Sequence, residues 1–204
     1  MKKLLAFAIL VATVISLVGC VPDFLGLGST PTRGVIEGNV YTNDYVGFTF
    51  TKPSSWRFYT DEEIAAQMNM AADQLLGDNF KEALKNNPAI YDMMAVDSAT
   101  GNNINIVYEN LKKSFSSNIS VEKYIEALKN QLASVSGMTV TFPEEYDTVK
   151  LGDSDFTRCV CTTRAYGITM TQIYYLRKVD GYMLSVIVTI VKGYTVAGVE
   201  KMFK

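Results

Sequence analysis

The residues best suited to covalent chemistry in this 204-residue chain are its cysteines, and the first, Cys20, has a particular setting. Lys2 and Lys3 are followed by an apolar run from Leu4 to Val18, and Gly19 directly precedes the thiol. A basic start, a short apolar core and a small residue at the end are typical of a secretory signal peptide. Modification at sulfur is therefore the chemistry that Cys20 could support at this boundary.

Leu17, Val18, Gly19 and Cys20 resemble the lipobox of bacterial lipoproteins. The resemblance implies cleavage between Gly19 and Cys20, lipidation of Cys20 on sulfur, and a protein held on the extracytoplasmic face of the cell membrane. Each buried CH₂ of a lipid contributes about 0.8 kcal/mol and one chain binds only marginally, so stable anchoring requires two or more chains. We predict that residues 1–19 are a lipoprotein signal peptide.

Two other interpretations of this N-terminal segment remain open. A transmembrane helix needs about 20 apolar residues, and the run here is shorter. An ordinary secretory signal followed by an unrelated cysteine would also fit. The position of Cys20 directly after a small residue favours the lipoprotein interpretation.

The chain contains no histidine. This absence excludes Ser-His-Asp and Cys-His nucleophilic catalysis, histidine-ligated zinc, and the usual general base near neutral pH. Cys159 and Cys161 stand two residues apart, a spacing of about 6.7 Å on an extended strand and the far edge of disulfide geometry. We expect two buried, neutral thiols; a strained redox pair or a soft-metal site is the alternative.

A cluster of carboxylates is the remaining candidate for catalysis. Carboxylate pairs can act as acid and base when their environments separate their pKa values. The residues in question flank predicted turns, where aspartate is common because it hydrogen-bonds the local backbone. The cluster comprises Glu144, Glu145, Asp147, Asp153 and Asp155.

The length and the net charge of the chain limit how many domains it can form and what it can bind. Without residues 1–19, which include two lysines, 17 basic and 21 acidic residues remain, a net charge of −4. A chain with this negative net charge lacks the excess of basic residues that binding to nucleic acid requires. The remaining 185 residues suffice for one domain with a sizeable core. We interpret residues 20–34, rich in Gly and Pro, as a lipidated tether, and residues 35–204 as a single domain. Whether the segment 21–34 docks on the domain stays open.

The helical signals come in three groups. Thr60 and Glu63 form a capping box, so we assign Asp61, Glu62 and Glu63 to a helix start and not to a metal or catalytic site. Apolar residues then recur at helical spacing up to Leu75, with Gly77 as the stop. Further helices are expected over 79–86, 121–136 and 195–203. Lys112-Lys113 is expected in a polar loop, and Trp56 in the core.

Strand patterns account for most of the remainder. We expect strands at 40–42, 46–51, 89–96 and 103–110, and then a run of strands over 138–142, 146–151, 154–165, 168–178 and 182–191. Asp180-Gly181 predicts a type I′ hairpin, which would place Tyr175 opposite Val186 and Tyr174 opposite Ile187. Both faces of this hairpin are apolar, so the sheet should be covered on both sides.

Two stretches carry a family resemblance: Tyr45 to Phe50 followed by Pro53 and Trp56, and Gln172 to Tyr174 followed by Asp180-Gly181-Tyr182. They resemble the PsbP-like fold, which includes DcrB-like bacterial lipoproteins, over residues 39–203. The resemblance implies an α+β domain in which helices cover both faces of an antiparallel sheet of about six or more strands. It also implies a non-enzymatic accessory role, and it supplies no active-site residues.

We therefore expect a lipid-anchored, non-enzymatic binding or accessory protein of the cell envelope. Its partners would be the membrane, through lipid on Cys20, and an envelope protein; no nucleic acid, cofactor or metal is expected. Two alternatives stay open: a carboxylate-dependent envelope enzyme, and an assembly factor that pairs through a sheet edge.

Overall fold

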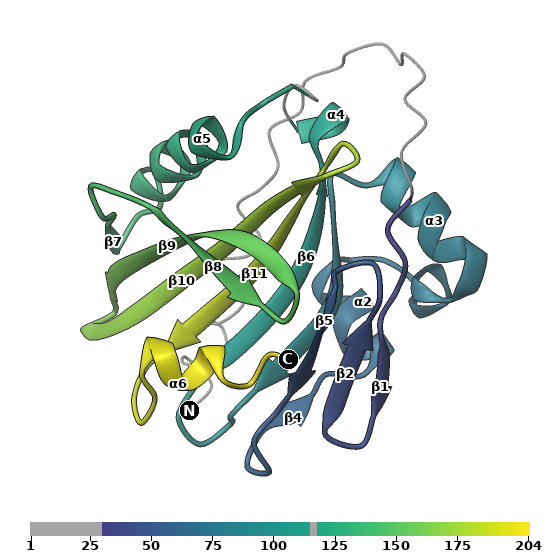
Figure 1. Ribbon diagram of the computed structural model, residues 1–204, viewed down its shortest axis with the longest axis horizontal. Helices are drawn as coiled ribbons and strands as arrows, with labels where there is room; N and C mark the ends of the chain where they lie inside the picture. Colours follow the sequence, from purple (N-terminus) through teal and green to yellow (C-terminus); the bar gives the residue numbers. More distant parts are fainter. Residues whose placement is uncertain (1–29, 115–117) are drawn as a thin grey trace.

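The structure is a computed structural model that describes residues 30–114 and 118–204. The predicted signal peptide, with Gly19 and Cys20, and the first part of the predicted tether lie outside the described residues. Figure 1 shows one large twisted sheet running across the molecule, with a smaller sheet beside it.

The large sheet has eight antiparallel strands, which confirms the predicted α+β class with an antiparallel sheet of six or more strands. Its order is β4-β5-β6-β11-β10-β9-β7, and β8 also pairs with β9. Every residue of β6 is buried, so this strand lies at the centre of the core. The strands are β4 (Arg57–Phe58), β5 (Ala89–Val96), β6 (Asn103–Asn110), β7 (Met138–Thr141), β8 (Asp147–Leu151), β9 (Ser154–Ala165), β10 (Ile168–Val179) and β11 (Tyr182–Ile190).

The small sheet has the order β1-β2-β3. The chain end completes one of its edges, because the Thr49 N–H donates to the Lys204 carbonyl at 2.7 Å and the Lys204 N–H donates back at 3.0 Å. Phe48 packs on Phe156 of β9 with ring centroids 6.0 Å apart, which joins the two sheets. The strands are β1 (Val35–Glu37), β2 (Val40–Asn43) and β3 (Phe48–Thr51).

Two helices begin where the sequence predicts, α2 at Asp61 and α5 at Val121, whereas Gly77, expected to stop a helix, is the first residue of α3. The Thr60 hydroxyl accepts a hydrogen bond from the Glu63 N–H at 3.3 Å, and the Glu63 carboxylate accepts one from the Thr60 N–H at 2.9 Å, which confirms the capping box. The Ser120 hydroxyl accepts a hydrogen bond from the Lys123 N–H at 3.3 Å and so caps α5, the longest helix among the described residues. The helices are α2 (Asp61–Gln67), η1 (Ala72–Leu75), α3 (Gly77–Asn86), α4 (Leu111–Ser114), α5 (Val121–Ala133) and α6 (Val196–Glu200).

The β10–β11 hairpin has the predicted register. Tyr175 pairs with Val186 and Tyr174 pairs with Ile187. Asp180 and Gly181 both have positive φ, at 49° and 84°, as a type I′ turn requires. The two-residue turn therefore sets the pairing along the whole of both strands.

Two expectations about helices are wrong. The helix that begins at Asp61 ends at Gln67 and a 3₁₀ turn follows, because Asn69 adopts a left-handed φ of 54° that an α-helix cannot continue through. The expected loop at Lys112-Lys113 is the one-turn helix α4. Burial of Leu111 and Ser114 at its two ends holds that turn against the domain.

Candidate functional site

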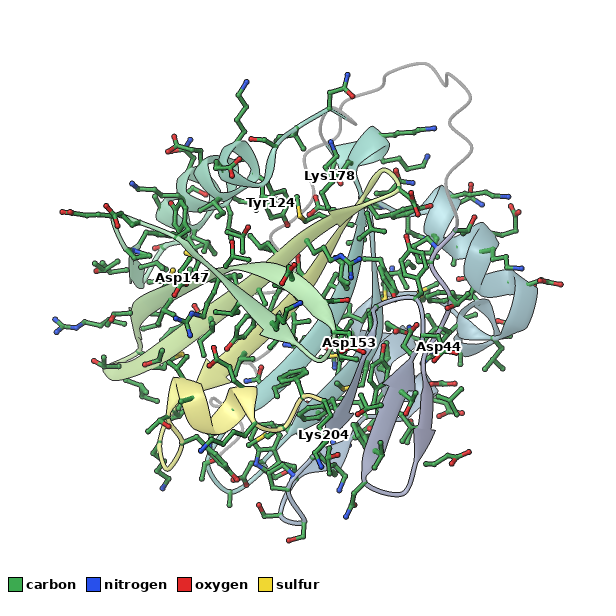
Figure 2. All side chains as sticks on the ribbon, in the orientation of Figure 1. Asp44, Tyr124, Asp147, Asp153, Lys178 and Lys204 are labelled. Carbon is green, nitrogen blue, oxygen red and sulfur yellow. The ribbon has the colours of Figure 1, made fainter. Side chains whose placement is uncertain are left out.

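Two of the five carboxylates considered for catalysis, Asp147 and Asp155, form surface salt bridges. Asp147 is paired with Arg158, and the Asp155 carboxylate lies 3.2 Å from the Lys150 ammonium. Asp147 begins β8 and Asp153 follows its end, so the strand separates them (Figure 2). Glu144 and Glu145 precede β8, and none of the five lines the cavity described below.

Cys159 and Cys161 are buried on one face of β9, with their sulfur atoms 3.6 Å apart and without a disulfide bond between them. This arrangement agrees with the favoured interpretation as neutral core thiols. The hydrogen bond between the thiols, together with burial, raises the pKa of Cys161, so its proton is held.

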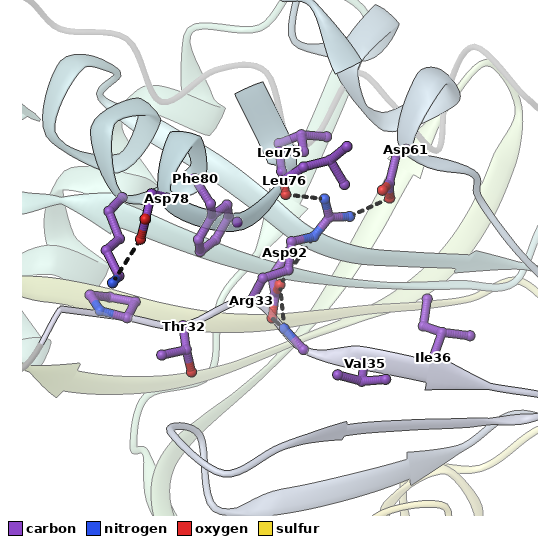
Figure 3. A pocket seen from close by; sticks show the side chains of 14 residues that line it. Thr32, Arg33, Val35, Ile36, Asp61, Leu75, Leu76, Asp78, Phe80 and Asp92 are labelled. Carbon is purple, nitrogen blue, oxygen red and sulfur yellow. Dashed lines mark hydrogen bonds and ion pairs between the residues drawn. The ribbon is translucent and has the colours of Figure 1, made fainter. Parts of the chain in front are cut away.

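A cavity lies elsewhere, between the small sheet and the helices after β4. It is an open groove of about 660 Å³, and one wall is formed by residues 31–36, from the end of the predicted tether into β1. The opposite wall comes from the start of α2 and from the junction of η1 with α3. Figure 3 shows Arg33 between these walls, and we call the cavity the Arg33 groove.

The floor of the Arg33 groove contains a buried carboxylate, Asp92. Tyr91 and Met93 pair with consecutive residues of β6, so Asp92 is the extra residue of a β-bulge. A bulge re-aims a side chain out of the normal alternation of a strand. It therefore turns Asp92 toward the groove from the middle of an otherwise buried strand.

Three donors surround the Asp92 carboxylate. It accepts hydrogen bonds from the Tyr41 hydroxyl, from the Asn43 side-chain amide at 2.9 Å, and from the Gly34 N–H at 3.0 Å. The Asn43 amide also donates to the Tyr108 hydroxyl at 3.1 Å.

Burial raises the pKa of Asp92, while the hydrogen bond from Tyr41 opposes that shift. Burial likewise raises the pKa of Tyr41, so the phenol keeps its proton and donates it to the carboxylate.

Arg33 connects the floor of the groove to its far wall. One guanidinium nitrogen lies 2.6 Å from the Asp61 carboxylate, and another donates to the Leu75 carbonyl at 2.7 Å. Its Nε lies 3.7 Å from Asp92, and its guanidinium lies 6.0 Å from the centroid of the Phe80 ring. Arg33 thus bridges the N-terminal segment to α2, to η1 and to the bulge in β5.

The rim of the Arg33 groove is apolar and exposed. Val35, Ile36 and Leu76 are 60%, 39% and 53% exposed, and all three line the groove. The fourth large exposed apolar side chain in the described part of the chain is Tyr166, which belongs to the β9–β10 turn. Clustering of exposed apolar groups around one cavity is typical of a binding surface.

These contacts answer part of what the sequence left open about residues 20–34. The described end of that segment docks on the domain, since Arg33 and Gly34 bond to it as given above and the Thr32 carbonyl accepts a hydrogen bond from the Asn43 amide at 2.8 Å. The groove therefore lies where the chain from Cys20 joins the domain.

Gly34→Ala is expected to lower the free energy of unfolding by about 1–3 kcal/mol, because the added methyl group would overlap the Tyr41 ring, 2.8 Å from its hydroxyl oxygen. Urea unfolding of the purified protein measures the loss. Gly198→Ala in α6 is the control, since its methyl group meets only a Thr195 side chain at 3.2 Å. Equal stability of Gly34→Ala and wild type would show that the segment is not held as described.

The sequence analysis did not identify Arg33 or Asp92. Arg33 stood in a segment interpreted as a tether, and Asp92 stood inside an apolar strand. A single carboxylate within the run Ala89–Val96 was the available signal. Asp61 was assigned to the first turn of a helix, which is confirmed, and its pairing with Arg33 adds a second role.

Among the described residues, no helix combines the length and apolar character needed to cross a bilayer. In the same part of the chain, cysteine, aspartate and glutamate side chains do not gather in threes in any arrangement that could hold a metal ion.

No family model matches this chain, and no curated protein matches it. Among solved structures, it is similar to a crystal structure from Bacteroides thetaiotaomicron VPI-5482, with 12% sequence identity and a TM-score of 0.41. The match covers 78% of this chain and 44% of the other, so this chain corresponds to less than half of that protein.

Proposed function

We propose that this chain is a lipid-anchored, extracytoplasmic binding protein of the cell envelope that acts without catalysis and engages its partner at the Arg33 groove. The observation that carries the proposal is the groove itself. Its polar groups are already hydrogen-bonded to one another, and its rim exposes apolar side chains. Exposed apolar side chains gathered around a cavity are suited to binding another surface, and the polar groups of this cavity do not need a ligand to satisfy them.

The position of the groove supports an accessory role at a membrane. The stretch 21–34 that follows Cys20 has fourteen residues, and a coil of that length spans about 20 Å. If lipid on Cys20 anchors the chain, the groove faces partners that are close to the membrane surface. An envelope protein with a segment near the membrane fits that position.

The proposal extends to the finer fold, a PsbP-like domain with helices over both faces of the large sheet. Tyr108 of β6 meets Phe80 of α3, with ring centroids 6.3 Å apart. The next residue, Glu109, accepts a hydrogen bond from Tyr124 of α5 at 2.6 Å. Consecutive strand residues point to opposite faces, so these two contacts support helices on opposite sides of β6.

The carboxylate enzyme is the weaker candidate. Two of its residues, Asp147 and Asp155, are paired with Arg158 and Lys150 at the surface, and none of the five lines the groove. Asp92 is the buried carboxylate beside the groove, and its hydrogen bonds from Tyr41, Asn43 and Gly34 hold it in a structural position. A general acid or base would need lone pairs or a proton directed at a substrate.

Cys20→Ala is expected to move the protein from the membrane fraction of cells to the soluble fraction, because the sulfur that carries the lipid is gone. Fractionation with immunoblotting, and the intact mass of the wild-type protein, measure the effect. A photoreactive residue at Leu76 should also crosslink a membrane protein in the wild type and lose it in Cys20→Ala.

Tyr166 is the control position for the crosslinker, since it is exposed and lies in a different part of the fold. A Cys20→Ala protein that stays in the membrane at full-length mass would contradict lipid anchoring. Equal crosslinking from Leu76 and Tyr166 would contradict binding at the groove.

A further inference from the structure

The free edges of the two sheets differ in how they are protected. β4 has two residues, and β8 carries the charged pairs of Asp147 and Lys150 along its length. Short edge strands and charged edges are the usual defences against pairing with another chain. In the small sheet, β3 pairs with residues 202–204, and β1 pairs with β2 and with no other strand of the described residues.

The backbone of β1 presents hydrogen-bonding groups on its outer side. Glu37 and Val40 flank a two-residue loop, so they exchange hydrogen bonds, and the ladder alternates from there. Ile36, one residue before Glu37, therefore directs its N–H and carbonyl away from β2. Gly34, two residues before Ile36, should also direct its N–H away from β2, and this N–H does donate to Asp92.

Apolar side chains border this open backbone on both sides. Ile36 and Val35 come from β1, and Leu76 comes from the opposite wall of the Arg33 groove, where Figure 3 shows the three around the cavity. An extended segment beside β1 would bury apolar side chains among them. None of the other strand edges in the described part of the chain carries an exposed large apolar residue.

Leu76 occupies a position that local structure does not favour. It is the N-cap of α3, with extended φ and ψ of −108° and 138° and no side-chain hydrogen bond to the helix. Ser, Thr, Asp and Asn are preferred there, and an apolar residue at an N-cap costs about 1 kcal/mol. An exposed leucine at this position is explained when its side chain packs on a partner.

The charged residues around the groove indicate which charge the partner segment should carry. Arg33 is paired with Asp61 and Asp92, and Lys81 lies 3.2 Å from Asp78. Glu37, at the end of β1, adds another acidic group. Carboxylates outnumber cations along this edge, which favours a segment that carries lysine or arginine.

We infer that the outer edge of β1 binds an extended segment of a partner protein by strand addition, with alternating apolar side chains seated against Ile36 and Leu76 and a basic residue toward the acidic end of the groove. Hydrogen bonds between the partner backbone and the backbone of Ile36 would hold the segment, and the groove would determine which side chains of the segment fit. The inference rests on the proposed function, because it names the partner of the same groove.

Panning a phage-displayed random nonapeptide library against the purified full-length chain in detergent tests this inference. Enriched peptides should alternate apolar with other residues and carry lysine or arginine. Fluorescence anisotropy with a labelled synthetic copy of the most enriched peptide then compares variants. Leu76→Ser should weaken binding about tenfold or more while keeping or raising stability, because serine is a good N-cap.

Two further variants sharpen the result. Ile36→Pro removes the outward N–H without removing a bond to β2, and should also weaken binding about tenfold. Tyr166→Ser removes an exposed apolar side chain elsewhere and should bind as wild type does. Urea unfolding of each variant confirms that it is folded.

Several outcomes would overturn the inference: no enrichment, enrichment of peptides without alternation, or equal binding by wild type and Leu76→Ser. A dimer in analytical ultracentrifugation that Ile36→Pro abolishes would assign the edge to a second copy of this chain. Failure of this inference can be distinguished from failure of the proposed function. Purified protein binds peptides whether or not Cys20 is lipidated, and crosslinking from Leu76 in cells would persist if only the strand-pairing mode were wrong.

Discussion

Replacing Asp92 with alanine is expected to lower the free energy of unfolding by about 3–5 kcal/mol. The substitution removes the acceptor for the Tyr41 hydroxyl, the Asn43 amide and the Gly34 N–H, and the Tyr41 and Asn43 side chains are buried. It also removes one of the two carboxylates beside Arg33. Urea unfolding at pH 7, followed by circular dichroism, measures the loss.

Asp155→Ala is the matched control for Asp92→Ala. Its carboxylate is about two-thirds exposed and its salt bridge to Lys150 is at the surface, so a change of about 0.5 kcal/mol or less is expected. A loss below about 1 kcal/mol for Asp92→Ala would mean that water or a rearranged partner satisfies the three donors. The network would then not be the element that holds the N-terminal segment.

The stability of the protein is expected to fall as the pH rises from about 5 to 7, because of Glu109. Burial raises the pKa of Glu109 from its ordinary value of 4.5 to about 7, although the hydrogen bond from Tyr124 opposes the shift. Between these two values the folded protein keeps a proton that the unfolded chain has lost. The stabilisation is complete below about pH 4.5 and is lost by about pH 7, and it amounts to about 3 kcal/mol.

Glu109→Gln tests this pH dependence, since glutamine keeps a hydrogen-bonding side chain of similar size and cannot ionise. Its stability relative to wild type should increase from pH 5 to 7 and level off above that range. Glu82→Gln, whose side chain is 64% exposed, is the control for losing a carboxylate at the surface. A difference between Glu109→Gln and wild type that stays constant from pH 5 to 8 would contradict burial of an ionisable Glu109.

The candidate site was harder to predict than the fold around it. Gly34 and Asp92 are 58 residues apart in the sequence, and each has an ordinary local interpretation: a glycine in a linker and a residue in a strand. The bulge that turns Asp92 toward the groove depends on how β5 pairs with β6, and no local pattern specifies that register shift. Leu76 could have been noticed only after the start of α3 was known.

The sequence by itself determined the elements whose signals are local. The Thr60 capping box, the Asp180-Gly181 turn and the period-two runs from Met138 onward depend on neighbours within a few residues, and all three are confirmed. The lipobox is equally local, and lipidation of Cys20 stays a prediction. Only the tertiary structure decided that the end of the predicted tether packs on the domain, that Arg33 joins Asp61 to Asp92, and that β1 is an open edge beside Leu76. These contacts form between distant segments, and their energy depends on packing and burial that periodicity and turn chemistry do not carry.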